Sequence, residues 1–230
     1  MGNDEDKANN NKYQKDYGFR IYKIYNNSPF KMLGVKELSD FIIPPKDLNS
    51  FNLTFEYWLK EKINEKIKVN IYSLLTRKMK EIEITVNEDD NKGGILGCEV
   101  NYENYISAEN KLLHVTNIKT KSFAQDNVFL IKDQDYIIGL KSLNDGKLYS
   151  LNNDKLKELI IEFSDILNRN KGKDCELYVY NVKRGPKVIL IKIPNNRRFS
   201  LGCDVAYGKI HPFPMKGEID EDEEKKTLKD

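Results

Sequence analysis

The sequence predicts an α+β protein, mainly β, built from two similar domains in tandem, each a small, partly open barrel with one main helix. Its 230 residues allow one large domain or two small ones, because a domain usually takes roughly 100–150 residues. Hydrophobic residues make up 39% of the chain and charged residues 32%, which suits compact cores under a polar surface. Short segments recur in the same order along the chain, and a repeat of domain length indicates tandem domains rather than a solenoid.

The repeat consists of four matched segments. Each pair shares its apolar pattern, and the order is the same in both copies. Residues 19–24 resemble 113–118, residues 40–43 resemble 135–138, residues 69–73 resemble 177–181, and residues 96–100 resemble 201–205. The offset between the copies is larger after the second match, which predicts an insertion near the helix of the second copy.

Each copy is predicted to run strand, helical turn, strand, helix and then three strands. In the first copy, Ile21 and Ile24 among polar neighbours indicate the opening strand. Ser28-Pro29 predicts the start of a helical turn, because proline is favoured at the first helical position. An amphipathic helix is predicted over residues 52–66 from residues at helical spacing, namely Phe55, Trp58, Leu59, Lys62 and Ile63.

The later elements follow from the same two periods. Alternation of Ile82, Ile84 and Val86 predicts a strand, and residues 189–193 repeat this pattern. A second helix is predicted over residues 152–169. Its apolar face consists of Leu156, Leu159, Ile160, Phe163 and Leu167.

Domain boundaries follow from the repeat and from two polar ends. We expect a disordered N-terminal tail over residues 1–16, because Asn, Lys and Asp dominate it and bury nothing. The first domain then spans residues 17–104 and the second spans residues 105–215. An acidic disordered tail over residues 216–230 follows the second domain.

Charge and composition exclude several classes of protein. Lys plus Arg number 38 against 36 for Asp plus Glu, so the net charge of +2 provides no field that attracts nucleic acid. No run of about 18 apolar residues exists to span a bilayer, and the polar start lacks a secretory signal. Cys98, Cys175 and Cys203 are far apart, which argues against a disulfide framework or a zinc knuckle. These features indicate a soluble cytoplasmic protein.

Leu-Gly-Cys occurs at the same place in both copies, ahead of a predicted strand. A glycine there turns backbone N–H groups outward, where they bind a carboxylate or carbonyl oxygen. An edge strand beside a helix also accepts an extended peptide. The alternative is a tight turn into a core strand, but two occurrences favour a shared groove. The candidate peptide-binding residues are Leu59, Leu96, Gly97, Cys98, Glu99, Val100, Leu201, Gly202, Cys203, Asp204 and Val205.

Catalytic motifs are absent from the sequence. Cys203 and His211 lie close together in the chain, and His114 and Cys175 are also present. A Cys–His pair needs an orienting group and an oxyanion site, and nothing marks either. There is no Walker loop, no His-Glu-x-x-His and no dinucleotide fingerprint. We therefore expect neither an enzyme nor a cofactor, and leave nucleophilic catalysis as the least favoured class.

The N-terminus carries a possible lipid site. Gly2 after Met1 permits N-myristoylation, although Asp6 stands where the usual pattern has Ser or Thr. An unmodified disordered start is the alternative.

Residues 17–214 resemble the Golgi reassembly stacking protein (GRASP) family. The most specific segments are Gly-Cys-Asp-Val-Ala-Tyr-Gly at residues 202–208, Ile-His-Pro-Phe-Pro at residues 210–214, and Asp-Tyr-Ile-Ile-Gly at residues 135–139. Asn-Ser-Pro at residues 27–29 and Ile-Tyr-Ser at residues 71–73 add support. The resemblance implies two tandem PDZ domains in a permuted strand order, with the peptide-binding loop late in each.

The resemblance also implies a function. It implies a non-enzymatic peripheral tether on the cytoplasmic face of Golgi membranes, anchored through a myristate on Gly2 and a golgin-like coiled-coil or C-terminal peptide partner. Such a protein self-associates in trans and supports Golgi stacking and secretory traffic. For self-association, the family's behaviour suggests a ligand segment with Tyr207, Gly208 and Ile210 from a neighbouring molecule. The alternative is a peptide-binding PDZ module that regulates a protease.

A metal site is a family feature that these residues contradict. Some family members hold zinc through a His on the first strand and a Cys just after the first binding loop. Arg20 and Glu103 occupy those places here. Because a guanidinium stays protonated and cannot ligate zinc, we expect no zinc at this site.

Overall fold

The computed structural model describes residues 16–45, 52–87, 94–153, 155–195, 199–208, 211 and 213. The chain divides into two compact units with the boundary between Ile106 and Ser107, and each unit is described by itself. The predicted disordered tails lie outside the described residues, apart from Asp16.

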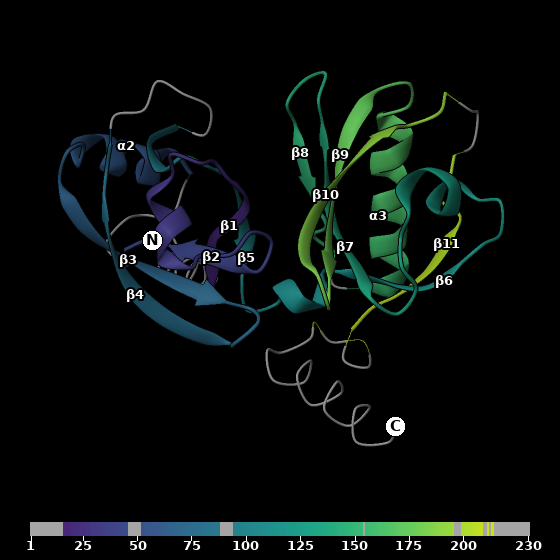
Figure 1. The fold of residues 1–230 in the computed structure, drawn as a ribbon, viewed down its shortest axis with the longest axis horizontal. Coiled ribbons are helices and arrows are strands. Elements are labelled where there is room, and N and C mark those ends of the chain that lie inside the picture. The colour runs from purple at the N-terminus through teal and green to yellow at the C-terminus, as the bar shows by residue number, and fades with distance from the viewer. Residues whose placement is uncertain are drawn as a thin grey trace, which may run out of the picture. The chain divides into compact units, whose positions relative to one another are not determined.

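The first unit is a five-stranded antiparallel sheet with one main helix (Figure 1). The strand order is β4-β3-β2-β1-β5, so β4 and β5 form the two edges. Ile21, Ile42 and Ile71 are completely buried at the centre of its core. The elements are β1 (Tyr17–Ile24), η1 (Pro29–Leu33), β2 (Asp40–Ile43), α2 (Asn52–Glu61), β3 (Lys66–Ser73), β4 (Lys78–Thr85), η2 (Gly94–Leu96) and β5 (Cys98–Asn104).

The helix of the first unit is shorter than predicted. The interpretation of residues 52–66 as one helix is wrong, because α2 ends at Glu61 and Lys66 already begins β3. Asn64 has a φ of +67°, the left-handed conformation in which asparagine commonly ends a helix. Its N–H donates to the carbonyl of Val86 at 2.6 Å, which turns the chain into β3.

The second unit repeats this plan with one strand more (Figure 1). The strand order is β10-β9-β7-β6-β11, with β8 paired to β7. The β7–β8 hairpin lies where the sequence predicts an insertion. The elements are η3 (Ala108–Asn110), β6 (Leu113–Ile118), η4 (Ala124–Val128), β7 (Asp135–Ser142), β8 (Leu148–Ser150), α3 (Leu156–Arg169), β9 (Asp174–Asn181), β10 (Gly185–Lys192) and β11 (Cys203–Ala206).

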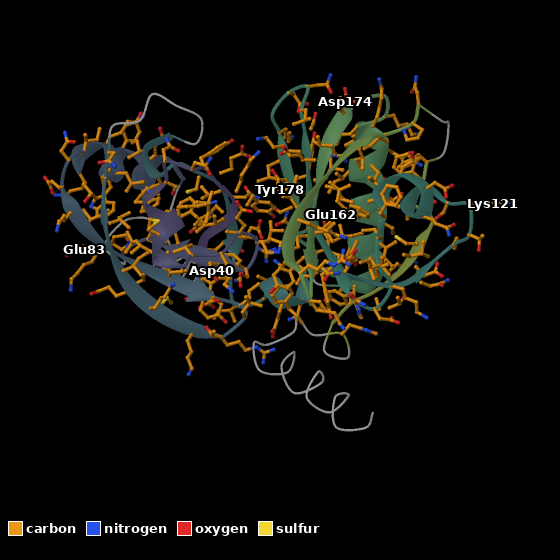
Figure 2. All side chains as sticks on the ribbon, in the orientation of Figure 1. Asp40, Glu83, Lys121, Glu162, Asp174 and Tyr178 are labelled. Atoms are coloured by element: carbon orange, nitrogen blue, oxygen red, sulfur yellow. The ribbon has the colours of Figure 1, made fainter. Side chains whose placement is uncertain are left out.

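The second helix begins later than predicted. The predicted start at residue 152 is wrong, because α3 begins at Leu156. Glu162, labelled in Figure 2, accepts hydrogen bonds at 3.0 Å and 3.1 Å from the N–H groups of Asn152 and Asn153. These two amides are therefore satisfied by a side chain of the helix and stay outside it.

The repeat is visible in matched hydrogen bonds as well as in the sequence. Asp40 and Asp135 begin β2 and β7, and both are buried. The Oδ2 atom of Asp40 accepts from the N–H of Lys36 at 3.0 Å, and that of Asp135 accepts from the N–H of Ile131 at 2.8 Å. Burial raises the pKa of Asp40. The predicted mainly β fold is confirmed, and within the described residues each sheet is open.

A glycine at the start of each late edge strand lets two loops touch. Gly97 precedes β5 with a φ of +61°, and a Cβ placed on it would lie 2.8 Å from the Cα of Ser28. Gly202 precedes β11 with a φ of +78°, and its Cβ would lie 2.5 Å from the Cβ of Ser122. Both serines lie in the turn that follows the first strand of their unit. The glycines are therefore required by conformation and by space.

Replacing Gly97 with alanine tests this requirement. We expect Gly97→Ala to lower the free energy of unfolding by about 2–4 kcal/mol, because a left-handed residue with a side chain and a backbone clash both cost energy. Urea denaturation monitored by circular dichroism measures the change. The matched control is Gly34→Ala, since Gly34 has a φ of +65° with no atom within 4 Å of the added Cβ. Equal losses in the two variants would show that the contact with Ser28 contributes nothing.

Candidate peptide-binding groove

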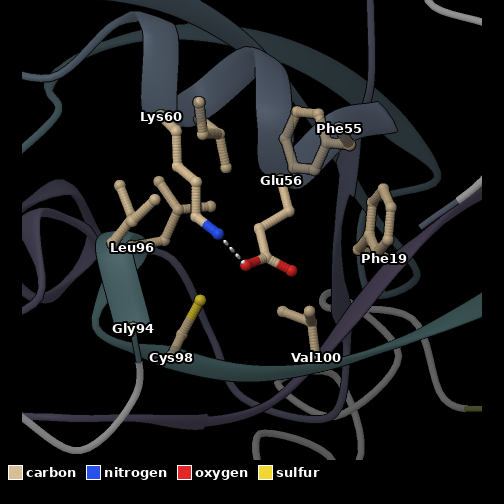
Figure 3. A pocket seen from close by; sticks show the side chains of 10 residues that line it. Phe19, Phe55, Glu56, Lys60, Gly94, Leu96, Cys98 and Val100 are labelled. Carbon is tan, nitrogen blue, oxygen red and sulfur yellow. Dashed lines mark ion pairs between the residues drawn. The ribbon is translucent and has the colours of Figure 1, made fainter. Parts of the chain in front are cut away.

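A pocket of about 550 Å³ lies between α2 and β5 in the first unit (Figure 3). Its wall on the sheet side comes from β1, β5 and η2, and its other wall comes from α2. The lining is mostly apolar and consists of Phe19, Phe55, Glu56, Leu59, Lys60, Gly94, Ile95, Leu96, Cys98 and Val100. A mostly apolar pocket beside an edge strand is the arrangement that accepts an extended peptide.

The backbone of β5 is available along one side of the pocket. β5 pairs with β1 on one edge only, because it is the last strand of the sheet. The carbonyl of Gly97 faces β1, where it accepts from the N–H of Tyr25 at 2.9 Å. Since peptide groups alternate in direction along a strand, those of Cys98 and Val100 face the free edge. The same two residues direct their side chains into the pocket (Figure 3).

The structure brings together most of the predicted residues of the first site. Leu59, Leu96, Cys98 and Val100 line the pocket. Glu99 does not, and its carboxylate instead accepts a hydrogen bond from the hydroxyl of Tyr25. Alternation of side chains along β5 explains this difference.

The backbone N–H groups that were predicted to bind a carboxylate or carbonyl oxygen are partly used within the protein. The N–H of Gly97 donates to the carbonyl of Gly94 at 2.9 Å, which closes the η2 turn. The hydroxyl of Ser28 donates to the carbonyl of Leu96 at 2.7 Å. The Gly97 N–H is thus available to a ligand only when its bond to Gly94 opens. The loop is better suited to strand pairing through β5 than to gripping a terminal carboxylate with three free amides.

An ion pair on α2 lies over the apolar floor, and sequence reasoning missed it. Lys60 Nζ lies 2.8 Å from Glu56 Oε1, and both side chains are more than half exposed (Figure 3). The hydrogen bond from Lys60 to Glu56 raises the pKa of Lys60. Exposed pairs at this helical spacing are weak, so a ligand can separate them at little cost. The sequence did contain a signal for this pair, because Glu56 directly follows Phe55 and Lys60 directly follows Leu59, and Phe55 and Leu59 both line the pocket.

The second predicted site lies along β11, the corresponding edge strand. Cys203 and Val205 pack partly against the core of the second unit, and Leu201 is buried. Asp204 points the other way, where Asn117 Nδ2 donates to its Oδ2 at 3.0 Å and lowers its pKa. Side chains therefore alternate along β11 as they do along β5. Cys203 and Val205 face the core, and Asp204 faces the opposite side.

The helices beside the two edge strands differ in charge. Because α2 ends at Glu61 and α3 at Arg169, the repeat places Ser164 and Asn168 where the first unit has Glu56 and Lys60. Asn168 Nδ2 donates to the carbonyl of Ser164 at 2.7 Å. Two positions that carry a charged pair on α2 therefore carry neutral side chains on α3.

The predicted self-association residues are only partly described. Ile210 and the lipidation residue Gly2 lie outside the described residues. Tyr207 packs partly against the core of the second unit, and Gly208 has a φ of +86°. The N–H of His211 donates to the carbonyl of Gly208 at 2.8 Å, which closes a turn. This segment is therefore bent where a paired strand would be extended.

The cysteines are unsuited to nucleophilic catalysis. Burial raises the pKa of Cys98 to about 12 and that of Cys203 to about 11. Both thiols stay protonated at neutral pH, and the thiolate is the nucleophile. Nδ1 of His211 contacts Nδ1 of His114 at 3.0 Å, so the hydrogen-bond partner of this imidazole is a second histidine and not a cysteine.

A buried ion pair occupies the positions where the resemblance implies a zinc site. Arg20 Nε lies 3.2 Å from Glu103 Oε2, with the side chains 1% and 4% exposed. The hydroxyl of Tyr22 donates to Glu103 Oε1 at 2.7 Å. Nε meets the carboxylate as an ion pair without an aligned hydrogen bond, and Nη2 has no hydrogen-bond partner among the described residues. The described residues also contain no cluster of three or more His, Cys, Asp or Glu arranged for a metal. Arginine does not fit the ligand set of zinc.

Comparison with known proteins decides the family. The family model described as "GRASP55/65 PDZ-like domain" matches residues 7–102 and 69–216. The chain belongs to this family. The tandem PDZ-like fold is therefore confirmed, because the family model matches the chain in two segments.

Two relatives illustrate the distance within the GRASP family. Golgi reassembly-stacking protein 1 of Homo sapiens is 26% identical over 204 residues, which cover 86% of this chain and 43% of that protein. GRASP65 homolog protein 1 of Saccharomyces cerevisiae is 27% identical over 176 residues, which cover 67% of this chain and 44% of that protein. The chain thus spans less than half the length of the curated relatives it matches.

Removing one charge from the buried pair tests its role. We expect Glu103→Gln to lower the free energy of unfolding by about 3–5 kcal/mol, because the Arg20 guanidinium remains buried without a counter-charge. The matched control is Glu83→Gln, which breaks an exposed pair with Lys66 and costs less than about 1 kcal/mol. Denaturation in urea measures both variants. We also expect the purified protein to lack stoichiometric zinc here, and zinc that disappears in Glu103→Gln would contradict the interpretation.

Proposed function

We propose that this protein is a peripheral tether and adaptor on the cytoplasmic face of Golgi membranes, which self-associates and binds peptides through its PDZ-like grooves. Family membership and relatives named Golgi reassembly-stacking proteins support a role in Golgi stacking and secretory traffic. The observation that carries the binding mode is the free edge of β5 beside an apolar pocket. No described helix has both the length and the apolar character to cross a bilayer.

The groove of the first unit binds its ligand by strand addition. The outward peptide groups of Cys98 and Val100 pair with the ligand backbone, and an apolar ligand side chain enters the pocket against Leu59 and Leu96. The ligand passes along Glu56 and Lys60, which separate to admit it. Golgin-like coiled-coil proteins and C-terminal peptides are further partners of this class, and the role needs no enzyme activity and no cofactor.

Self-association uses the same groove. The ligand is the segment of a neighbouring molecule that carries Tyr207, Gly208 and Ile210, with Ile210 in the pocket. One such contact is small and orders a bent segment, so its dissociation constant is micromolar or weaker. Many copies on two facing membranes raise the effective concentration and provide avidity.

The alternative is a soluble peptide-binding module that regulates a protease. The same pocket and edge strand would serve it, so groove geometry does not separate the two functions. Aggregation of vesicles by membrane-attached protein separates them, because only a tether that self-associates in trans links vesicles.

The ligand side of self-association is tested by Ile210→Asp. We expect this variant to lose self-association in light scattering at high protein concentration, because a carboxylate replaces the apolar anchor. The matched control is Phe129→Asp in the same unit. Phe129 is 71% exposed with a φ of +51°, a conformation that aspartate tolerates. Unchanged scattering of Ile210→Asp would rule out this segment as the ligand.

The groove side is tested by complementation. Val100→Asp places a charge at the mouth of the pocket and should also abolish self-association. A head-to-tail contact needs one intact groove and one intact ligand segment. An equimolar mixture of Val100→Asp and Ile210→Asp should therefore form heterodimers, although each variant alone stays monomeric. A mixture that stays monomeric while wild type associates would contradict the head-to-tail mode.

Membrane attachment is tested at the N-terminus. We propose that Gly2 is myristoylated and that a protein partner or self-association supplies a second attachment, because one myristoyl chain gives only marginal binding. Gly2→Ala should move most of the protein from the membrane fraction of cells to the soluble fraction. A Gly2→Ala variant that stays fully on membranes would exclude the lipid, and mass spectrometry of the cellular N-terminus checks the modification directly.

A further inference from the structure

Two histidines meet at the end of the second unit. His114 on β6 and His211, beyond β11, face each other with their Nδ1 atoms 3.0 Å apart. The His114 ring stacks on Tyr136 of β7, with centroids 4.4 Å apart and an interplanar angle of 7°. The Nε2 atom of His114 is buried and has no hydrogen-bond partner among the described residues.

The segment after β11, which carries His211, is held on the second unit by a second contact. Phe213 is 1% exposed and packs against Tyr136 and Tyr180, with ring centroids 5.8 Å and 4.6 Å away. On the other side of His211, its own N–H closes the turn to the carbonyl of Gly208. This segment is thus held on the second unit by a polar contact between the two imidazoles and by apolar packing of Phe213.

We propose that His114 and His211 form a proton-sensitive latch, which holds the segment after β11 on β6 at neutral pH and releases it in mild acid. The inference rests on the proposed function in one respect, because this is the segment we assign as the self-association ligand. Latched, the segment is bent at Gly208 and Tyr207 packs on its own unit. Released, it can extend and pair with β5 of another molecule.

The number of protons that the pair can hold explains the switch. In the closed pair, one Nδ1–H donates to the other Nδ1, which requires that the accepting ring is neutral. One extra proton is compatible with this bond, because an imidazolium also donates through Nδ1. A second is not, since two N–H groups and two positive charges would then oppose each other at 3.0 Å. The closed pair thus holds at most one extra proton, whereas the separated rings can hold two, so acid favours release.

The surroundings favour the closed form above the ordinary pKa of histidine. Burial lowers the pKa of His114, His211 lowers it further, and the backbone and carboxylate of Asp133 act in the opposite direction. Among the described residues, Tyr136 also contacts the ring, and a tyrosine is neutral in this range. Because the lowered pKa belongs to the closed form, the latch is stable above about pH 6.5 and weakens as the pH falls below it, by up to about tenfold per pH unit.

Hydrogen exchange in the full chain tests the latch. The readout is the protection of the peptide that contains the His211 amide, relative to its intrinsic rate. In wild type we expect protection to fall by up to about tenfold between about pH 6.5 and pH 5.5. His114→Phe keeps the ring on Tyr136 but removes the bond, so its protection should be low at both values. His211→Phe serves as a second variant should the first unfold. Protection of β9 controls for the integrity of the unit.

Two outcomes decide against the latch, and they are distinguishable from failure of the proposed function. Equal, pH-independent protection in wild type and His114→Phe overturns it. Release without a rise in light scattering overturns its regulatory role. In that case Ile210→Asp separates failure of the regulatory role from failure of the proposed ligand. If the segment is not the ligand, the variant scatters light as strongly as wild type. If the segment is the ligand and only the regulation fails, the variant scatters less. Release together with increased scattering supports both.

Discussion

The close contact of Gly97 with Ser28, repeated by Gly202 with Ser122, is the constraint on which each late edge strand depends. Without a Cβ, the loop before the edge strand packs directly on the turn after the first strand. The positive φ of each glycine then directs the chain into β5 or β11. The edge strand is thereby fixed at its start, and its free side faces solvent along the helix. A groove between a strand and a helix needs both elements held in this way.

The shared frame carries different chemistry in the two units. Beside β5 the helix provides Glu56 and Lys60, whereas the equivalent places beside β11 are Ser164 and Asn168. Buried polar groups also differ, since the first unit buries an ion pair of Arg20 and Glu103. The two units therefore share the backbone contacts at the start of the late edge strand, while the side chains on the helix beside it differ.

Much of the fold could be predicted from the sequence, because apolar periodicity and the repeat both report burial. Periodicity failed at helix ends, where Asn64 and Glu162 act through backbone conformation and single hydrogen bonds. In the site, Leu59 and Val100 were predicted because strand and helix positions follow from the repeat. Glu56 was missed, since a charged residue on an amphipathic helix usually faces solvent. The bond that uses the Gly97 N–H is a property of the folded turn, which residue types alone do not reveal.

The two edges of the first sheet differ in a way that favours β5 as the proposed binding edge. An exposed edge strand invites pairing with other chains, and charged side chains are the usual protection. β4 carries such protection, because Lys68 pairs with Glu81 at 2.8 Å, and Glu83, labelled in Figure 2, pairs with Lys66. A strand added there would bring its backbone among these charges. β5 instead presents Val100 beside an apolar pocket. Among the described residues, β5 therefore combines an edge that no strand pairs with an apolar pocket, which supports the proposed strand addition there.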